Sequence, residues 1–518
     1  MKTFAQFGIC ALVILSTVVS GECNEGAPDL EMARKKAAQK KRRIVYNDDG
    51  VYVRPFETPK KFYRARLQQI IDTQVDTVSF NVGATTIFTF DTDVGETYGE
   101  FISSNSPAFA QNVKKGIAGL KKTDDTNVGL AVDYCHSNGI EFILSLRMND
   151  VHDSFHSFML SQWKRDNTNY LMGPKSLNYE IPEVRDYIYR ILESFCTRFD
   201  IDGIELDWWR DPRAFPPTQE DKPVEARHVE MMNDLMRRIR EMTERVGYER
   251  GRPLLIAART PMSVERSLAV GLDLQTWLKE DLIDLLGVGG GYAPMAIASS
   301  VREIADLAHA HGVPVFVTIS SSGMHPTRWY GSGHESVEAW RGAAMNIWHS
   351  GADAVYTFNF CPPERDERFD QLGSIDSLKG MDKVYSIDRM IIEKFPKNGR
   401  CGLVTPDRLP ITLEKESWTR AKLPVGENIA ANTPSGKTCS ARLRLKFSAI
   451  ADDDALAIRL NGMELGDIIS FSDSSVNLEL DPKLFNEGYN IVEAKLTSQR
   501  ESAEMPVIER LDLTVRYQ

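Results

Sequence analysis

The chain has 518 residues, of which 42% are hydrophobic and 26% are charged. This balance is typical of a globular protein and excludes a wholly disordered chain, a collagen and a polytopic membrane protein. The formal net charge of −11 makes nucleic acid a poor candidate partner, because an acidic surface repels a phosphate backbone. Seven cysteines are too few for a disulfide scaffold, so the fold must rest on a hydrophobic core.

The first residues have the pattern of an export signal. Lys2 precedes a 13-residue apolar run from Phe7 to Val19, and the small residues Ser20 and Gly21 follow. The run is shorter than the roughly 20 residues that span a bilayer. We therefore expect a signal peptide over residues 1–21, a secreted or periplasmic protein, and no transmembrane segment after cleavage. An N-terminal membrane anchor is the alternative. Residues 22–41, which are basic from residue 27 onward, are expected to form an exposed leader.

The cysteines leave more than one interpretation open. Loss of Cys10 with the signal peptide leaves six, which permits up to three disulfides. Cys135 and Cys196 fall in predicted helices, where buried free thiols are at least as well expected. No Cys-x-x-Cys motif occurs, so neither a zinc ribbon nor a thioredoxin-type redox site is indicated.

Residues 42–400 alternate short apolar runs with helical patterns. The strand candidates are 42–48, 76–82, 140–147, 201–208, 253–259, 283–289, 313–320 and 353–360. Consecutive Val, Ile, Leu or Phe residues in each run are typical of a strand buried on both faces of a parallel sheet. A helix candidate follows each run, the clearest one starting at Pro182, a favoured first helical position. Eight such units predict an α/β fold, a (β/α)8 TIM barrel, rather than a doubly wound sheet, for which the Gly-x-Gly-x-x-Gly motif is missing.

The pattern changes after residue 401. Apolar and polar residues alternate over 441–447, 456–460 and 511–517, and Asn461-Gly462 supplies a tight-turn signal. A period of two without a helical segment predicts a smaller antiparallel β-sandwich over residues 401–518.

The active site of such a barrel lies at the carboxyl ends of its strands. Polar and aromatic side chains at these ends form the predicted substrate-binding set. They are Asp48, Asn81, Arg147, Asn149, His152, Trp208, Trp209, Arg210, Arg259, Tyr292 and Asn359.

The fourth strand candidate carries the main chemical signal. Side chains alternate along a strand, so Glu205, Asp207 and Trp209 share one face, which we expect to be the barrel interior. Two carboxylates inside a buried strand are costly unless they are paired or used. A carboxylate pair beside tryptophans indicates glycoside cleavage, because one acid protonates the leaving oxygen, a second carboxylate assists, and sugars stack on indole rings. Asp207 is the lead catalytic candidate.

The partner of Asp207 is left open by the sequence. Glu205 and Asp150 are the other predicted catalytic residues, while Asp48 and Glu364 are further candidates for the second carboxylate. A salt bridge to Arg147 or Arg259 that only closes the barrel is the alternative to a catalytic role.

Rival chemistries have weaker signals. His152 and His156 are spaced i,i+4, but the first strand lacks the His-x-His of barrel amidohydrolases, so neither a metal nor another cofactor is expected. No Gly-x-Ser-x-Gly motif supports a serine nucleophile. The arginines at or after strand ends, which are Arg147, Arg210, Arg259 and Arg328, suit bidentate binding of uronate or sulfate, or equally salt bridges to nearby acids.

A family resemblance accompanies these motifs. Residues 178–212 resemble the fourth unit of bacterial glycosyl-hydrolase-like 10 barrel proteins in the PEVRD helix start, the DGIELD strand and the WWR end. Segments 271–292 and 352–360 also fit, so the resemblance covers about 42–395. It implies a glycoside hydrolase superfamily barrel. The tail over 453–496 is similar to galactose-binding-like sandwich modules, which implies a role in sugar binding or in bracing the barrel.

Two departures from related patterns bear on the mechanism. The fourth strand is similar to the DGxDxDxE strand of chitinase-type barrels, but Trp209 stands where those proteins have their proton donor. Many barrel glycosidases carry a catalytic carboxylate at the end of strand seven, and the segment VTISSS has none. The second catalytic group therefore stays unassigned.

These observations predict an exported hydrolase of O-glycosidic bonds with a polysaccharide or oligosaccharide substrate, neutral or anionic. Two alternatives are kept. One is a carbohydrate-binding protein on a glycosidase barrel that has lost catalysis, and the other is a metal-dependent hydrolase.

Overall fold

The computed structural model describes residues 29–49, 59–123, 125–173, 175–289, 298–320, 336–388, 409–450, 454–468, 471–498 and 504–518. The predicted signal peptide over residues 1–21 lies outside these ranges, as do Tyr292 and Arg328. Within them, no helix combines the length and apolar character needed to cross a membrane.

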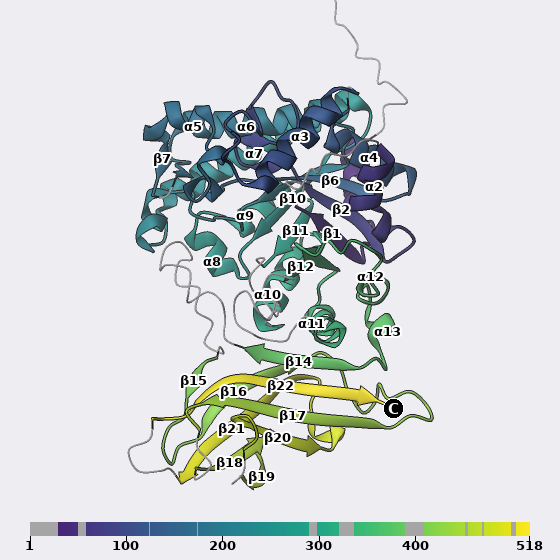
Figure 1. Cartoon of the computed structure of the whole chain (residues 1–518), viewed down its shortest axis with the longest axis vertical. Helices are drawn as coiled ribbons and strands as arrows, with labels where there is room; N and C mark the ends of the chain where they lie inside the picture. The colour runs from purple at the N-terminus through teal and green to yellow at the C-terminus, as the bar shows by residue number, and fades with distance from the viewer. Residues whose placement is uncertain are drawn as a thin grey trace, which may run out of the picture.

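Eight parallel strands close into a barrel in the order β1-β13-β12-β11-β10-β9-β6-β2 (Figure 1). These strands are β1 (Ile44–Asp48), β2 (Val75–Asn81), β6 (Glu141–Arg147), β9 (Gly203–Asp207), β10 (Leu255–Thr260), β11 (Leu285–Val288), β12 (Val315–Ser320) and β13 (Ala354–Phe358). Each falls within or overlaps one of the eight strand candidates, so the predicted α/β barrel is confirmed.

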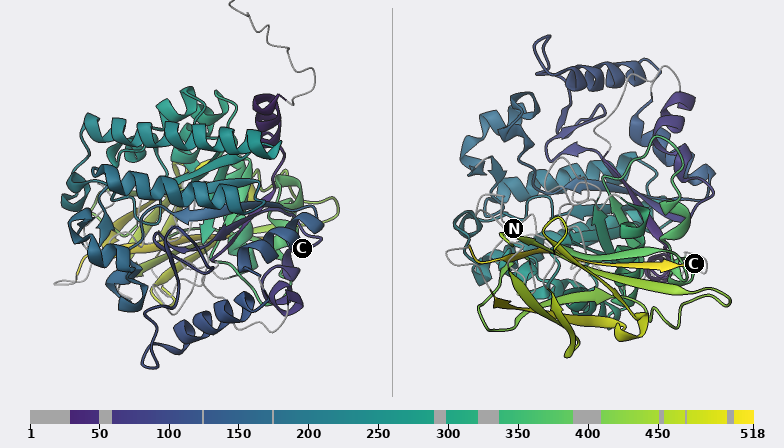
Figure 2. Two further views of the ribbon diagram at one scale, coloured as in Figure 1. Left: turned by 90° about the horizontal axis from the view of Figure 1, so that it is seen from above. Right: turned by 60° about the horizontal axis from the view of Figure 1, so that its bottom comes forward.

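Helices cover the outside of the barrel. They are α2 (Pro59–Arg66), α3 (Ala108–Lys121), α4 (Asn127–Ser137), α5 (Gln162–Asp166), α6 (Pro182–Arg198), α7 (Ala226–Arg250), α8 (Val264–Ala269), α9 (Leu274–Lys279), α10 (Ala298–His309), α11 (Val337–His349), α12 (Arg368–Gln371) and α13 (Ile375–Leu378). Short strands lie between them: β3 (Gly83–Ala84), β4 (Ile87–Phe88), β5 (Glu96–Thr97), β7 (Leu171–Met172) and β8 (Ser176–Leu177). Figure 2 shows the long helices α6 and α7 side by side on the barrel wall.

Helix α6 illustrates why these segments are helical. Pro182 is its first residue, where the missing N–H costs nothing. Val184, Ile188 and Ile191, at helical spacing, are completely buried. The apolar stripe therefore turns one side of α6 toward the sheet, as the sequence predicts.

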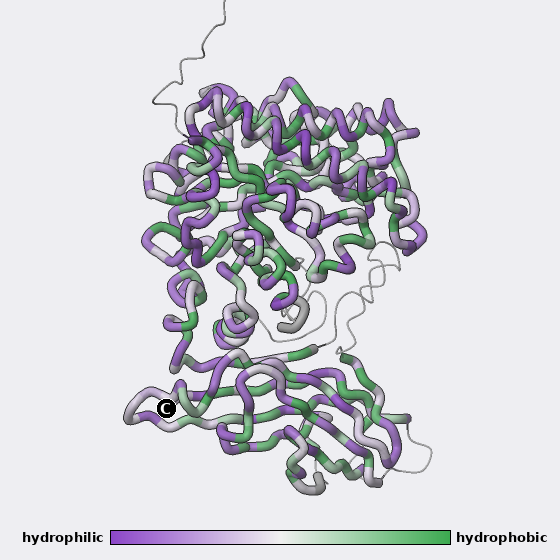
Figure 3. The backbone as a smooth tube through the Cα atoms, turned by 180° about the vertical axis from the view of Figure 1, so that it is seen from behind, coloured by the Kyte–Doolittle hydropathy of each residue, from purple (hydrophilic) through white to green (hydrophobic). Residues whose placement is uncertain are grey.

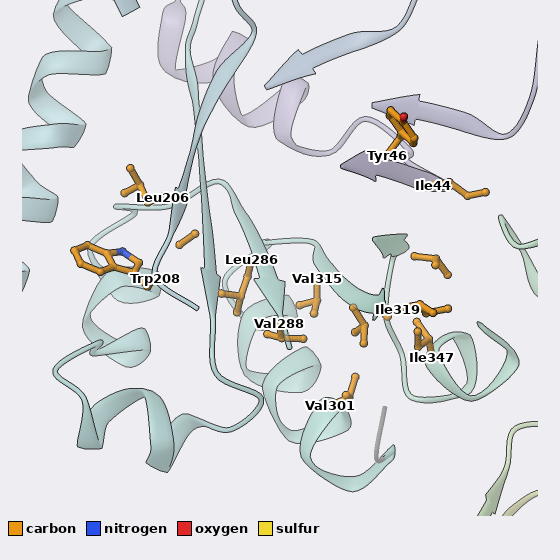
Figure 4. Close-up of a cluster of buried hydrophobic side chains, with 14 of the residues drawn as sticks. Ile44, Tyr46, Leu206, Trp208, Leu286, Val288, Val301, Val315, Ile319 and Ile347 are labelled. Carbon is orange, nitrogen blue, oxygen red and sulfur yellow. The ribbon is translucent and has the colours of Figure 1, made fainter. Parts of the chain in front are cut away.

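Strand alternation divides the apolar side chains into an inner and an outer set. Val45, Leu255, Leu285 and Phe316 pack together in a small cluster inside the barrel. Their strand neighbours belong to the larger core between sheet and helices, including Leu206, Leu286 and Val288 (Figure 4). Figure 3 shows hydrophobic segments gathered in the middle of the barrel and hydrophilic ones around it.

A buried ion pair closes the amino-terminal end of the barrel. Arg42 donates to both carboxylate oxygens of Glu141, at 2.7 and 2.6 Å, and also to three backbone carbonyls. The Thr77 hydroxyl donates to the same carboxylate at 2.8 Å. The side chains of Arg42 and Glu141 are only 1% and 6% exposed, so each depends on the other for its charge compensation.

Helix α1 (Leu30–Ala38) lies within the predicted leader, and two of its side chains, Arg34 and Ala38, are buried while the others are exposed or half-buried. Arg34 is buried and donates to Asp284 at 2.5 Å and also to Asp281. Ala38 packs against the inner barrel cluster. The basic composition, which suggested a solvated segment, instead supplies partners for acidic residues at the end of the barrel.

The smaller unit consists of two packed antiparallel sheets. The first has the order β14-β22-β17-β20, with β15 paired to β22, and the second has the order β16-β21-β18-β19. The strands are β14 (Lys383–Asp388), β15 (Ile411–Thr412), β16 (Thr419–Val425), β17 (Cys439–Ser448), β18 (Ala455–Leu460), β19 (Met463–Ile468), β20 (Ser475–Leu480), β21 (Gly488–Ser498) and β22 (Val507–Tyr517). Strand β14 lies inside the range 42–400 that the sequence assigned to the barrel, yet it pairs with the last strand of the chain.

Close backbone contacts join the sandwich to helix α11 of the barrel (Figure 1). A Cβ atom on Gly342 would collide with the carbonyl of Val384 in β14, and one on Gly426 would collide with the carbonyl of Met345. Asn346 in α11 also donates to the Pro424 carbonyl at 3.2 Å. Glycine is required at both crossing points because the two backbones meet there.

The described cysteines are free thiols: Cys135, Cys196, Cys361 and Cys439. Cys135 in α4 and Cys196 in α6 are buried, which confirms the free-thiol interpretation for both. Cys23 and Cys401 lie outside the described residues.

The Arg42–Glu141 pair gives a stability prediction. Glu141→Ala leaves a buried guanidinium without its carboxylate, so we expect a loss of about 3–5 kcal/mol in the free energy of unfolding. Glu230→Ala, which also removes a carboxylate from an arginine but at a site where that carboxylate is 60% exposed, should cost less than about 1 kcal/mol. Urea unfolding of the full chain measures both. Equal losses would contradict the role assigned to the buried pair.

Candidate active site

Asp207 lies between two arginines at the carboxyl end of the barrel. Its register partners are Arg147 in β6 and Arg259 in β10. Arg259 donates from Nε to Oδ1 at 3.1 Å and from Nη2 to Oδ2 at 2.6 Å. The side chain of Asp207 is 2% exposed and that of Arg259 is 1% exposed. The carboxylate is thus held in one orientation by a bidentate, charge-assisted contact.

Aromatic rings fix the other side of Arg259. Its guanidinium carbon lies 4.5 Å from the ring centroid of Phe358 and 5.5 Å from that of Tyr356, both in β13. Within the described part of the chain, the buried Nη1 atom of Arg259 has no hydrogen-bond partner. One donor therefore remains uncommitted beside Asp207.

Glu205 lies one layer deeper, beside Ser145 and Ala257 in the register. The hydroxyls of Ser145 and Tyr356 donate to Oε1 at 2.7 and 3.1 Å. Burial raises the pKa of Glu205 and the nearby Asp207 carboxylate raises it further, while Arg259 opposes both effects. The net effect is a carboxyl group that ionises less readily than a free one, although the Ser145 and Tyr356 hydrogen bonds also lower its pKa.

Asp150 forms a second buried centre just beyond β6. Its Oδ1 atom accepts from the backbone N–H of His152 at 2.8 Å and lies 2.7 Å from His152 Nδ1. Its Oδ2 atom accepts from Arg147 at 3.1 Å. Burial alone would raise the pKa of Asp150, but the hydrogen bond from His152 and the positive charges of Arg147 and Arg210 hold it well below the usual range.

The contacts of His152 define its tautomer. Arg210 Nη2 lies 2.6 Å from His152 Nε2, and an arginine only donates hydrogen bonds. Nε2 therefore accepts, and Nδ1 carries the proton that it donates to Asp150. The imidazole side chain is 31% exposed, while the Asp150 side chain is completely buried. A carboxylate-supported imidazole thus stands at the barrel mouth.

Three predicted site residues point elsewhere. Asp48 faces the outer helices, where Arg66 of α2 binds it through both carboxylate oxygens. Trp208 is completely buried on the outer face of β9 (Figure 4). Its ring packs edge-on against Tyr179. The position after β9 therefore offers no exposed Trp208 ring for a sugar.

Asn149, predicted to bind substrate, has hydrogen-bond partners within the protein. Its amide accepts from the N–H of Leu177 at 3.0 Å and donates to the carbonyl of Arg213 at 2.8 Å. It is completely buried, so it ties two loops together and does not face a ligand.

Asn81, Trp209 and Asn359 lie at or just beyond the ends of their strands. Asn81 accepts from the N–H of Gly83 at 2.7 Å and shapes the turn after β2. Trp209 is 9% exposed, and its backbone N–H donates to the Arg259 carbonyl at 3.1 Å. Asn359 follows β13 with a φ of 54°, a left-handed conformation that asparagine tolerates. Tyr292 lies outside the described residues.

Several residues of the mouth were not in the predicted set. Asp49 pairs with Arg147, and Tyr356 and Phe358 line Arg259. Alternation along β13 could have identified the two aromatic residues, because they share a face with the small Ala354. Their apolar character made them look like core packing alone.

No cluster of three or more His, Cys, Asp or Glu residues suited to a metal occurs in the described ranges. His156, the partner of His152 in the i,i+4 pattern, stacks on Phe158 with ring centroids 5.4 Å apart. The His pair of the sequence is thus not brought together around a shared ligand position.

No protein-family model and no curated protein sequence matches the chain. Several glycoside hydrolases are among the solved structures to which the chain is similar. An α-L-fucosidase isoenzyme 2 from Paenibacillus thiaminolyticus has 14% identity and a TM-score of 0.42 over 64% of this chain and 48% of that chain. The PgaB (BpsB) glycoside hydrolase domain from Bordetella bronchiseptica has 11% identity and a TM-score of 0.37 over 65% and 99%. A GH26 β-mannanase from Bacteroides ovatus has 15% identity and a TM-score of 0.32 over 67% and 86%.

These likenesses are too distant to transfer a reaction, a substrate or a residue role. The chain also spans only about half the length of the fucosidase. The resemblance to the glycosyl-hydrolase-like 10 group, and that of the tail to galactose-binding-like modules, stay predictions.

Glu205 gives a pH prediction. The pKa of Glu205 is raised in the folded state above its unfolded value, which lies near the ordinary value of 4.5. Its stabilising contribution to the free energy of unfolding is therefore fully present below the unfolded pKa and is lost as the pH rises through the folded pKa. Glu205→Gln keeps the neutral form at every pH. From pH 4.5 upward, the stability of this variant relative to the parent should therefore rise by up to about 1.4 kcal/mol per pH unit. Urea unfolding of both proteins from pH 4 to pH 8 measures the difference, and a constant difference would refute the raised pKa of Glu205.

Proposed function

We propose that the chain hydrolyses O-glycosidic bonds of a carbohydrate at the carboxyl end of the barrel. The observation that carries this proposal is the presence of two unlike groups there: Asp207, a carboxylate held by Arg259, and His152, an imidazole supported by the buried Asp150. Glycosidic cleavage needs a negative group for the oxocarbenium-like transition state and a proton for the leaving oxygen. The two groups supply these separately.

Asp207 is the lead catalytic residue of this proposal. Its fixed carboxylate attacks or stabilises the sugar carbon on which positive charge develops. Arg259 acts as a positioning residue, because its two hydrogen bonds and its aromatic support leave the carboxylate one orientation. Preorganisation of this kind lowers the cost of reaching the transition state.

His152 replaces a carboxylic acid as the proton-transfer group. In its acid form, Nε2 gives a proton to the leaving oxygen as the bond to the sugar carbon breaks, and in its neutral form it takes a proton from the incoming water. Asp150 is buried and engaged on both oxygens, so its proposed role changes from catalysis to positioning of the imidazole. Arg210 Nη2 lies 2.6 Å from His152 Nε2 in the structure. The Arg210 side chain must therefore move away before the leaving oxygen can bind at Nε2.

The mouth itself gives little support to an anionic substrate. Arg147 binds Asp49 and Asp150, and Arg259 binds Asp207, so both guanidiniums are already paired with carboxylates. The sugar and the linkage therefore stay open. Action outside the cytoplasm is proposed from residues 1–21 alone.

Carbohydrate binding without cleavage is the second candidate function. One observation favours it: both oxygens of Asp207 already accept hydrogen bonds, from Arg259 and the Arg210 backbone N–H, and both oxygens of Asp150 are engaged by Arg147 and His152. A network of ion pairs of this kind also closes the end of a barrel when it has no catalytic role. The two candidates differ in a single measurable property, the release of new reducing ends.

The first activity prediction concerns Asp207. Asp207→Asn should lower the rate of reducing-end release on a panel of polysaccharides by at least about 10²-fold, because the transition-state charge loses its carboxylate. Asp284→Asn is the matched control: this aspartate is also buried and bound by two arginines, but at the opposite end of the barrel, so catalysis should survive.

Parent-level activity in Asp207→Asn would end the assignment of this residue. A parent protein that binds a glycan of the panel but releases no reducing ends would establish the second function instead.

The second activity prediction concerns His152. His152→Asn should remove the limb of the pH–rate profile that reports the imidazole and lower kcat more than KM, because it deletes the proton-transfer group. Asp150→Asn should lower kcat as well, since an amide cannot hold the imidazole in the same tautomer. Arg210→Ala should leave that limb in place. An unchanged profile in His152→Asn would show that another group moves the proton.

A further inference from the structure

Three polar side chains meet where the sandwich contacts helix α11 (Figure 1). Lys383 begins β14 and is completely buried, and Glu427, two residues after the end of β16, is 2% exposed. Lys383 Nζ lies 3.1 Å from Glu427 Oε1 and 3.3 Å from Oε2. The side-chain amide of Asn432 donates from Nδ2 to Oε2 at 2.9 Å. An amine and a carboxamide are therefore bound to the same carboxylate oxygen.

Backbone contacts hold the two segments together. A Cβ atom on Gly380 would lie 2.6 Å from Cγ of Pro434 and 3.7 Å from the Asn432 carbonyl oxygen, so the turn before β14 packs directly on the loop after β16. Val384 and Gly426, the sequence neighbours of Lys383 and Glu427, form the backbone contacts of the sandwich with α11. Close packing on both sides thus fixes where the three side chains start.

The surroundings of the amine make it easier to deprotonate than a solvated lysine. Burial lowers the pKa of Lys383, and the Glu427 carboxylate opposes this effect. The ring centroid of Tyr517 lies 5.3 Å from Nζ, and the Tyr385 hydroxyl donates to Glu427 Oε1 at 2.6 Å. Transfer of a proton from Lys383 to Glu427 gives an uncharged amine, which is the form that attacks an electrophile.

The cluster contains every group that an intramolecular amide exchange requires. These groups are a nucleophilic amine, a carboxamide as the electrophile and a carboxylate that moves protons between them. Amides resist amines in free solution, but groups held in the right geometry react as if present at about 10⁵–10⁸ M. Asn432 is only half-buried, so the leaving ammonia has a route to solvent.

We propose that Lys383 and Asn432 become joined by an isopeptide bond, with Glu427 as the proton-transfer group. Lys383 passes a proton to Glu427, and Nζ attacks Cγ of Asn432. The Nζ–Cγ bond forms, one Nζ proton moves to Nδ2, and the Cγ–Nδ2 bond breaks. The departing ammonia takes the proton that Glu427 holds. A lysine ammonium and a carboxamide thus give a secondary amide and an ammonium ion, without an oxidant or a reductant.

The bond would link the two sheets of the sandwich. Strand β14 belongs to one sheet and β16 to the other, and both contact α11. A covalent link between distant points of a chain stabilises the fold chiefly by restricting the unfolded chain, as a disulfide does. The four cysteines within the described ranges are free thiols, so none of them provides such a link.

A second buried lysine provides an internal comparison. Lys164 Nζ donates to Asp153 Oδ2 at 2.8 Å, and both side chains are 3% exposed. Its other acceptors are the backbone carbonyls of Asp150 and Lys175, at 3.1 and 3.0 Å. Within the described part of the chain, Asp153 Oδ1 has no hydrogen-bond partner, so no carboxamide is bound there. This pair lacks the electrophile and should remain an ion pair.

Mass spectrometry of the denatured full chain tests the proposal. The parent should be lighter than its sequence by one ammonia, and a tryptic digest should contain residues 380–389 joined to residues 423–437. Lys383→Arg, which keeps the positive charge, should restore the sequence mass and remove the joined peptide. Asn432→Ala and Glu427→Gln should do the same. Lys164→Arg is the matched control and should keep both the lower mass and the joined peptide.

A parent at its full sequence mass would overturn the proposal and leave Lys383 and Glu427 as an ion pair. Loss of ammonia within residues 423–437 alone would also overturn it, because the product is then a cyclic imide of an asparagine with its own backbone. A joined peptide in Glu427→Gln would refute the role of Glu427. The mass of the parent decides the proposal even where a variant fails to fold, and it does so whether or not the barrel cleaves glycosides.

Discussion

The bidentate pair between Asp207 and Arg259 is the constraint on which the barrel mouth depends. It places a carboxylate in the interior row of strands, and every neighbour is arranged around that charge: aromatic rings behind Arg259, a hydroxyl-bound Glu205 below, and Arg147 beside it. An unpaired carboxylate at this depth would be prohibitively costly. The site and the stability of the barrel therefore share the same atoms.

Buried ion pairs lie at the two ends of the barrel, and between them lie apolar side chains together with Glu205 and its hydroxyl partners. Arg42 and Glu141 satisfy each other at the amino end, and the Asp207 row does so at the carboxyl end, with Val45, Leu285 and Phe316 between them. Both ends pay the desolvation cost of ions, but only the carboxyl end adds a partly exposed imidazole. That asymmetry separates a structural ion pair from a candidate reaction centre.

The sequence predicted the strands well because hydrophobic period and alternation are local signals, and alternation alone also turned Glu205 and Asp207 inward. It failed where partners come from far along the chain. Asp48 faces outward because Arg66 binds it, Trp208 is buried by Tyr179, and Arg34 orders a segment that looked like a solvated leader. The spacing of residues along the sequence gives neither long-range contacts nor hydrogen-bond partners. The role of His152 could therefore be proposed only from the structure.

The glycine contacts at Gly342 and Gly426 carry a consequence for how the two units work together. Backbones in direct contact leave no linker to swing, so the sandwich and the barrel mouth keep a constant separation. Helix α11 leads directly into barrel strand β13, so any displacement of the sandwich would have to displace a helix of the barrel wall as well.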